Sequence, residues 1–255
     1  MIRRSRLALA LGLTLALGVS GIAFAGGGAA AENVSTLTAQ VSGKKKPKFD
    51  KKKFKKTSLF TQVQTDYGTP FGDPEVHSEE VYIDFSKNIK LKPSSAPKCS
   101  ANTSTMTTSE ARAACGSSQV GTGAARAHVG PGIDFNDFQV TVFNGPGNNQ
   151  LILHAWSPSL NGGGVGPGNP AVIIGDIVNS PAGKKYGKRL SVPDVSDVNS
   201  DLGGLYFFNA TIKKGKYVTA RCKSKNMKFQ AQWVYDDGSS DTDTTSQKCK
   251  RKKKK

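Results

Sequence analysis

Hydrophobic and polar residues alternate with a period of two along much of the chain. The clearest case is residues 227–235, where five apolar side chains alternate with the polar residues Lys228, Gln230 and Gln232. Similar patterns occur at residues 59–65, 81–85, 138–143, 151–156, 205–212 and 216–222, and residues 171–178 form a more continuous apolar run. Short period-two segments separated by glycine-rich turns are typical of antiparallel strands. We therefore predict an all-β fold, an antiparallel β-sandwich of the Ig-like or jelly-roll-like kind.

One segment departs from this pattern and predicts a single short helix. Thr107 is followed three residues later by Glu110, which is the spacing of a capping box, and residues 110–114 are good helix formers. We expect about two turns of helix that end at Cys115.

The N-terminal residues have the layout of a secretory signal peptide. Arg3, Arg4 and Arg6 precede an uncharged apolar run that ends in Ala23-Phe24-Ala25. A basic start, an apolar middle and a small-x-small ending predict export and cleavage after residue 25. The alternative is an uncleaved anchor, because the apolar run approaches the roughly 20 residues that span a bilayer. We therefore predict a signal peptide at residues 1–25 and a secreted protein. Association of this protein with the cell envelope is part of the same prediction.

The formal net charge of +17 lies mostly outside the predicted strands. Residues 44–56 contain nine lysines and one aspartate, and residues 248–255 contain seven basic residues. Residues 57–247 carry equal numbers of acidic and basic residues and are neutral overall. Like charges repel and a lysine-rich segment buries little apolar surface. We therefore predict a disordered arm at 26–56, a folded domain at 57–249 and a basic tail at 250–255.

The lysine runs are the predicted binding residues of an exported, non-catalytic protein. They are Lys44, Lys45, Lys46, Lys48, Lys51, Lys52, Lys53, Lys55, Lys56, Lys252, Lys253, Lys254 and Lys255. Outside the cell we expect them to bind anionic cell-wall polymers or lipid headgroups, where each lysine contributes about 1 kcal/mol near an anionic bilayer. Two alternatives remain: the tails only keep the domain soluble, or Phe49 and Phe54 insert among headgroups. We expect no specific nucleic-acid partner.

Four cysteines remain in the exported chain and predict two disulfide bonds. Three pairings are possible, and we favour Cys99–Cys115 with Cys222–Cys249 because each pair brackets a compact local unit. Each bridge then contributes roughly 3 to 3.5 kcal/mol in the loop-entropy model. The cysteines are too far apart in sequence for the usual zinc spacing. We expect neither a metal nor a cofactor.

The titratable residues indicate no reaction. His77, His128 and His154 are scattered, and neither a zinc-hydrolase motif nor a G-x-S-x-G elbow is present in the mature chain. Glu80 and Asp84 share one face of a predicted strand by parity. That face is the basis of an alternative, a secreted carbohydrate-active or carbohydrate-binding protein that also uses exposed aromatics such as Trp156.

A second alternative is a calcium-stabilised adhesion module. Asp236, Asp237, Asp241 and Asp243 flank a glycine-containing turn and offer carboxylate oxygens. The spacing does not follow the EF-hand order, because no glutamate closes the loop. A simple turn between two strands explains the same residues.

Several short motifs resemble a known group of proteins. They are residues 97–99, 110–115 and 119–124, then 216–222 and 233–238. In these pieces the chain resembles uncharacterised secreted β-rich proteins of high-GC Gram-positive bacteria. The resemblance implies a β-sandwich and export, and it carries over no catalytic residue.

Overall fold

The computed structural model describes residues 34–66, 78–128, 134–161, 170–193, 205–213 and 215–251. The predicted signal peptide, Lys252 to Lys255 and His77 lie outside these residues. The main strands are β1 (Val34–Val41), β4 (Leu59–Asp66), β5 (Ser78–Ser86), β7 (Gln119–His128), β8 (Asp134–Asn144), β9 (Gln150–Trp156), β10 (Ala171–Asn179), β11 (Tyr186–Val192), β12 (Leu205–Ile212), β14 (Asn226–Tyr235) and β15 (Ser240–Lys248). The short strands are β2 (Lys48–Phe49), β3 (Lys55–Lys56), β6 (Ile89–Leu91), β13 (Val218–Ala220) and β16 (Lys250–Arg251).

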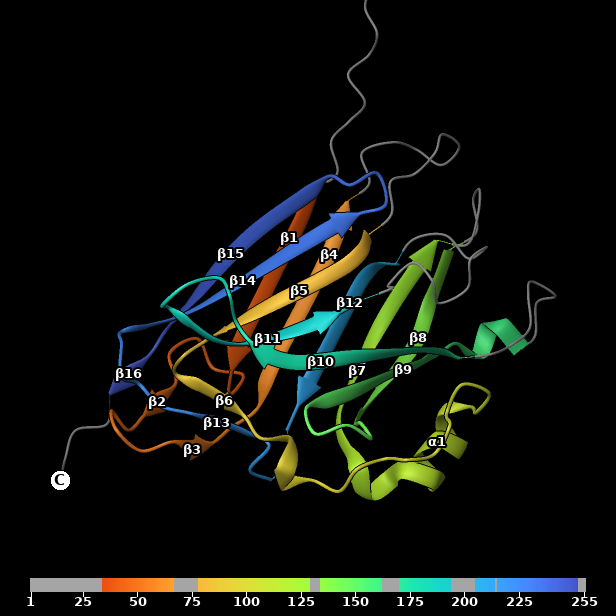
Figure 1. The fold of residues 1–255 in the computed structure, drawn as a ribbon, viewed down its shortest axis with the longest axis horizontal. Helices are drawn as coiled ribbons and strands as arrows, with labels where there is room; N and C mark the ends of the chain where they lie inside the picture. Colours follow the sequence, from red (N-terminus) through yellow and green to blue (C-terminus); the bar gives the residue numbers. More distant parts are fainter. Residues whose placement is uncertain are drawn as a thin grey trace, which may run out of the picture. The chain divides into compact units, whose positions relative to one another are not determined.

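The eleven main strands form one antiparallel sheet in the order β1-β4-β12-β7-β8-β9-β10-β11-β5-β14-β15. The sheet curls until its edge strands β1 and β15 lie side by side (Figure 1). Because an odd number of strands alternate in direction, these two edge strands run parallel to each other. The all-β antiparallel prediction is confirmed, but the sheet is closer to a nearly closed barrel than to the sandwich that we expected.

Side chains of β15 close the seam between the two edge strands. Asp241 Oδ2 accepts the Ser35 N–H at 3.0 Å, and Asp243 Oδ2 accepts the Leu37 N–H at 2.7 Å. Gln247 Oε1 accepts the Val41 N–H at 2.9 Å, while its Nε2 donates to the Val41 carbonyl at 3.2 Å. These bonds satisfy backbone groups of an edge that would otherwise be free to pair with another chain.

Apolar residues of alternate strand positions fill the interior. On β14 the predicted face of Met227, Phe229, Ala231, Trp233 and Tyr235 is buried. On β7 the motif of residues 119–124 has a different role, because glycines let this strand approach β12 closely. A Cβ atom at Gly121 would lie 2.5 Å from the Thr211 carbonyl oxygen, and one at Gly123 would overlap the Asn209 carbonyl oxygen.

The predicted helix is α1 (Thr108–Cys115), and both bonds of its capping box are present. Glu110 Oε2 accepts the Thr107 N–H at 2.8 Å, and these bonds hold the pKa of Glu110 below its usual range. The helix packs on the outer face of β8 and β9, where Ala111, Phe143 and Ile152 form a second, smaller core with Cys99–Cys115. No helix among the described residues is long and apolar enough to cross a membrane.

The barrel has two different ends, which we name by their strand termini. The loop end contains the strand termini Asp66, Ser78, Val192 and Leu205. The closed end contains Val41, Leu59 and Ile212. There the small sheets β3-β13-β6 and β16-β2 adjoin the barrel.

Residues 34–56 differ from the disordered arm that we predicted. Residues 34–41 are β1, a full strand of the barrel whose buried residues alternate with exposed ones, and residues 44–56 contain β2 and β3. At the other terminus, Lys250 and Arg251 form β16 instead of belonging to a disordered tail. The folded unit therefore begins before residue 57 and extends past residue 249.

Candidate anion-binding surface at the closed end

The lysine-rich segment leaves the barrel through a tight turn at the end of β1. Ser42 and Gly43 have φ values of 60° and 57°, a left-handed conformation that glycine tolerates best. β2 then pairs in parallel with β16, and β3 pairs antiparallel with β13. The segment is thus bound to the C-terminal part of the chain at two places.

Phe49 anchors the segment in the main hydrophobic core. Its side chain is 6% exposed and belongs to the same apolar cluster as the barrel interior. A buried phenylalanine contributes roughly 1.5–3 kcal/mol through apolar burial alone. This burial explains why a chain so rich in lysine is ordered, and it removes Phe49 from any role in inserting among lipid headgroups.

Asp50 shapes the next turn with backbone hydrogen bonds. Its Oδ1 accepts the N–H of Lys52 at 2.7 Å and of Lys53 at 2.9 Å. The N–H groups of Lys53 and Lys52 hold the pKa of Asp50 below its usual value. Its carbonyl oxygen accepts the N–H of Cys222 at 2.8 Å, which ties the turn to the second disulfide.

Phe54 is held between two cations rather than presented to solvent. Lys90 Nζ lies 4.4 Å from the centroid of the Phe54 ring, and the Arg221 guanidinium lies 4.5 Å from it. Cation–π contacts of this kind contribute about 0.5–1 kcal/mol each at exposed sites. Phe54 therefore packs against folded residues as well.

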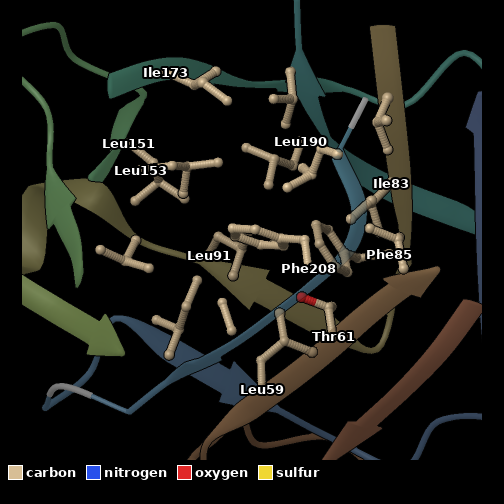
Figure 2. A pocket seen from close by; sticks show the side chains of 17 residues that line it. Leu59, Thr61, Ile83, Phe85, Leu91, Leu151, Leu153, Ile173, Leu190 and Phe208 are labelled. Atoms are coloured by element: carbon tan, nitrogen blue, oxygen red, sulfur yellow. The ribbon is translucent and has the colours of Figure 1, made fainter. Parts of the chain in front are cut away.

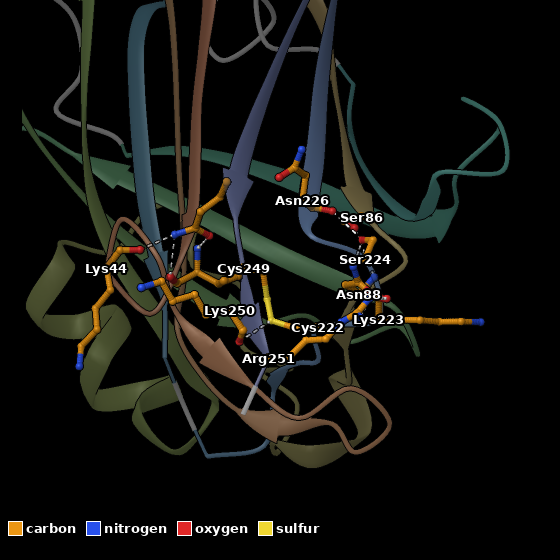
Figure 3. The surroundings of a disulfide bond; sticks show 12 residues. Lys44, Ser86, Asn88, Cys222, Lys223, Ser224, Asn226, Cys249, Lys250 and Arg251 are labelled. Carbon is orange, nitrogen blue, oxygen red and sulfur yellow. Dashed lines mark hydrogen bonds between the residues drawn. A yellow bond between two sulfur atoms is a disulfide. The ribbon is translucent and has the colours of Figure 1, made fainter. Parts of the chain in front are cut away.

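The disulfide Cys222–Cys249 locks the C-terminal side of this surface (Figure 3). The Cα atoms of the pair are 5.9 Å apart, and Lys250 N donates to the Pro47 carbonyl at 2.9 Å. Gln247 Nε2 also donates to the Lys44 carbonyl at 2.6 Å. Cys99 and Cys115 form the other disulfide, with Cα atoms 5.2 Å apart, so both disulfide predictions are confirmed.

All nine lysines of this segment are exposed. None forms an ion pair with another described residue. Neighbouring strands and turns add further exposed cations at the same end, namely Lys90, Lys92, Lys213, Lys216, Lys223, Lys225, Lys250 and Arg251. The cationic surface therefore contains more residues than the lysine runs of the sequence, and its residues belong to folded strands and turns.

An open groove of about 630 Å³ crosses this surface. Lys44, Lys46, Lys48, Lys56 and Lys213 line it, together with the hydroxyl-bearing residues Ser42, Thr57 and Ser58. No carboxylate is among the lining residues. Five lysines around one hollow form an arrangement that favours a phosphate- or carboxylate-bearing ligand. We call it the lysine groove.

Acidic residues gather at the loop end, opposite the lysine groove. Those at strand termini or turns there are Asp66, Glu79, Glu80, Asp134, Asp137, Asp236, Asp237, Asp241 and Asp243. The neutrality of residues 57–247 thus conceals a separation of charge along the barrel axis. Sequence order gave no sign of it, because cations and acids of neighbouring strands are interleaved along the chain.

The carboxylate face proposed for a carbohydrate-active site is engaged in structural bonds. Asp84 is fully buried. Its two carboxylate oxygens accept hydrogen bonds from Nε and Nη2 of Arg189, at 2.9 and 2.8 Å. Tyr82 OH donates to Glu80 Oε2, and this bond raises the pKa of Tyr82. The Arg189 guanidinium also lies 4.7 Å from the Tyr82 ring. Asp84 is therefore not available to act as a nucleophile or base on a bound sugar. Trp156, expected as an exposed aromatic, is half-buried.

Three of the four aspartates considered for calcium, Asp237, Asp241 and Asp243, accept backbone N–H groups. Asp241 and Asp243 accept backbone N–H groups across the seam, and Asp237 Oδ1 accepts the Ser239 N–H at 2.8 Å. Within the described part of the chain, no three His, Cys, Asp or Glu side chains are grouped as metal ligands.

The described histidines do not converge with a nucleophile. His154 is buried under α1, with its Nε2 2.9 Å from the Met106 carbonyl oxygen. Because a carbonyl only accepts, Nε2 carries the proton, and burial lowers the pKa of His154. His128 stacks on Tyr206 with ring centroids 4.2 Å apart.

Comparison with protein-family models, with curated proteins and with solved structures finds no match to this chain.

Proposed function

We propose that this is an exported, non-catalytic protein that holds a linear anionic polymer of the cell envelope in the lysine groove. The observation that carries the proposal is the convergence of five lysines on one groove without a carboxylate. A hollow of this kind fits a chain better than the flat surface of a bilayer. For this reason we favour a wall polymer over lipid headgroups.

The folded setting of the lysines supports this function. A disordered arm loses backbone entropy of about 1–2 kcal/mol per residue when a ligand orders it. Here Phe49, Asp50 and the β2–β16 pairing have already ordered the segment. Each lysine near an anionic surface contributes about 1 kcal/mol, so the five lysines of the groove together correspond to a Kd on the order of 0.1 mM at low salt.

The test is titration of the purified protein with a glycerol-phosphate polymer at low and high salt. Lys44, Lys46 and Lys48 are changed together to glutamine, and we expect affinity to fall about 100-fold at low salt. A matched control changes Lys184, Lys185 and Lys228, which line a separate groove of about 620 Å³. The control has the same net charge and should retain most of the affinity.

Two results would contradict the proposal that the lysine groove binds the polymer. Equal losses in both triple variants would mean that bulk charge alone is responsible. Tighter binding of the unchanged protein to anionic vesicles than to the polymer would favour lipid headgroups as the ligand.

Export is the second part of the proposal. The two disulfides among the described residues are consistent with an oxidising compartment. Mass spectrometry of the protein from culture medium should give a chain that starts at residue 26 with no free thiol. Full-length protein with four titratable thiols, recovered only from inside cells, would contradict export.

A further inference from the structure

The interior of the barrel contains a cavity of about 50 Å³ that is separate from the lysine groove. Seventeen residues line it, and all except Thr61 are apolar (Figure 2). Leu59, Phe85, Leu190 and Phe208 point into this space from four different strands. A cavity with so few polar groups offers water too few hydrogen bonds, so it stays dry.

A smaller cavity of about 10 Å³ lies next to it, on the side of the loop end. The two cavities share Val63, Val81, Leu205 and Phe208 as lining residues. The smaller one is also lined by Ser78, the first residue of β5. The four shared side chains form the wall between the two cavities, and the smaller cavity adds the polar residues Gln64, Thr65 and Ser78 to its lining.

Ser78 is the feature of the smaller cavity that points to a ligand. Ser78 is 4% exposed, and its hydroxyl has no hydrogen-bond partner among the residues that the structure describes. The neighbouring Thr65 is different, because its hydroxyl lies 3.0 Å from Ser35 Oγ, which in turn lies 2.7 Å from Tyr235 OH. A buried hydroxyl without a partner is unfavourable, so a ligand that supplies one gains affinity.

The size and charge of the site define the class of ligand. An engineered apolar cavity of about 150 Å³ binds benzene, so a cavity of 50 Å³ accepts a smaller group. A carboxylate end is disfavoured, because no basic residue lines either cavity and a buried unpaired charge is costly. The polar end must therefore be neutral.

We propose that the barrel interior binds a small neutral amphiphile, a short alkyl chain that ends in a hydroxyl group. The alkyl part occupies the larger cavity, and the hydroxyl forms a hydrogen bond with Ser78 Oγ. A molecule that spans both cavities passes between Val63 and Phe208, whose side chains change rotamer to admit it. This inference does not depend on the lysine groove.

The test uses 1-butanol and xenon as probes of the purified protein, with methyl NMR as the measurement. Both probes should shift the methyl resonances of Ile83, Leu151 and Leu190. Ser78→Ala should weaken butanol binding about 5-fold and leave xenon binding unchanged, because xenon forms no hydrogen bond.

A second pair of variants tests the larger cavity. Ala210→Leu fills it and should abolish the response to both probes, while Ala124→Leu, on the outer face of β7, should not. Failure of both probes to shift the methyl resonances of the unchanged protein would overturn the proposal. So would a Ser78→Ala variant that binds butanol as tightly as the unchanged protein.

Discussion

At the closed end of the barrel, the Cys222–Cys249 disulfide and two small sheets hold a set of cations, whereas acidic residues gather at the loop end. Like charges repel, so a cationic surface needs strong local restraints to keep its lysines together. The closed end supplies these restraints through Phe49, Asp50 and Cys222. The lysine segment is therefore ordered by its few non-lysine residues.

The largest effect on the closed end is expected from Phe49→Ala. Loss of a buried phenylalanine destabilises a protein by about 3–5 kcal/mol. Chemical denaturation should give a decrease of this size in the free energy of unfolding. Hydrogen exchange monitored during denaturation should show an early loss of protection in residues 44–56. Phe54→Ala is the matched control and should cost only about 1 kcal/mol, since Phe54 contributes mainly cation–π contacts. Equal effects would mean that Phe49 does not anchor the segment.

Removal of Cys222–Cys249 should have the next largest effect. With a sequence separation of 27, the loop-entropy model predicts a loss of about 3.5 kcal/mol for the double alanine variant. Removal of Cys99–Cys115, with a separation of 16, should cost about 3 kcal/mol. The affinity for the anionic polymer distinguishes the two variants. We expect it to fall in the first and to persist in the second, which lies away from the lysine groove.

The seam should be stronger toward the closed end than toward the loop end. Gln247 is 6% exposed and bonds to both Val41 and Lys44, so Gln247→Ala should cost about 2 kcal/mol. Asp241 is more exposed and accepts the Ser35 N–H, so Asp241→Ala should cost less than about 1 kcal/mol. Urea denaturation of both variants measures this difference. A reversed order would contradict the comparison of the two ends.

The smallest effect is a pH dependence that involves neither end. Burial lowers the pKa of His154 below the value near 6.5 of the unfolded chain. Between the two values the unfolded state binds more protons, so stability is complete above about pH 6.5 and decreases as pH falls toward the folded pKa. His154→Gln retains a donor for the Met106 carbonyl and should remove this slope in denaturation curves measured from pH 7 to 5. An unchanged slope would mean that groups other than His154 cause the pH dependence of stability.

Local patterns predicted much of the fold. The alternation at residues 227–235 corresponds to β14 at Asn226–Tyr235, and the capping box at Thr107 begins α1. Both signals depend on residues a few positions apart, and so does the turn chemistry between strands. The pairing of Cys99 with Cys115 followed from the same local argument.

Four main strands, β1, β7, β11 and β15, were not predicted, and β1 and β15 illustrate two different reasons. β1 carries the alternation of Leu37, Ala39 and Val41, but the segment has few large apolar residues and adjoins the lysine run, so its composition favours a disordered arm. β15 contains no large apolar residue, and its alternation lies in Asp241, Asp243 and Gln247. Its strand conformation depends on pairing with β14 and on the seam with β1, both of which are tertiary contacts.

The sequence by itself determined the strand-rich composition, the short helix and the number of lysines, and it favoured the observed disulfide pairs, because these depend on near neighbours and on residue type. Only the tertiary structure decided that the lysine segment is folded, that the cations face one end and the acids the other, and that the barrel encloses an apolar cavity. These features depend on the direction and register of strands that are far apart in the chain. Side-chain periodicity tells which residues share a face of a strand, but it does not tell which strand lies beside it.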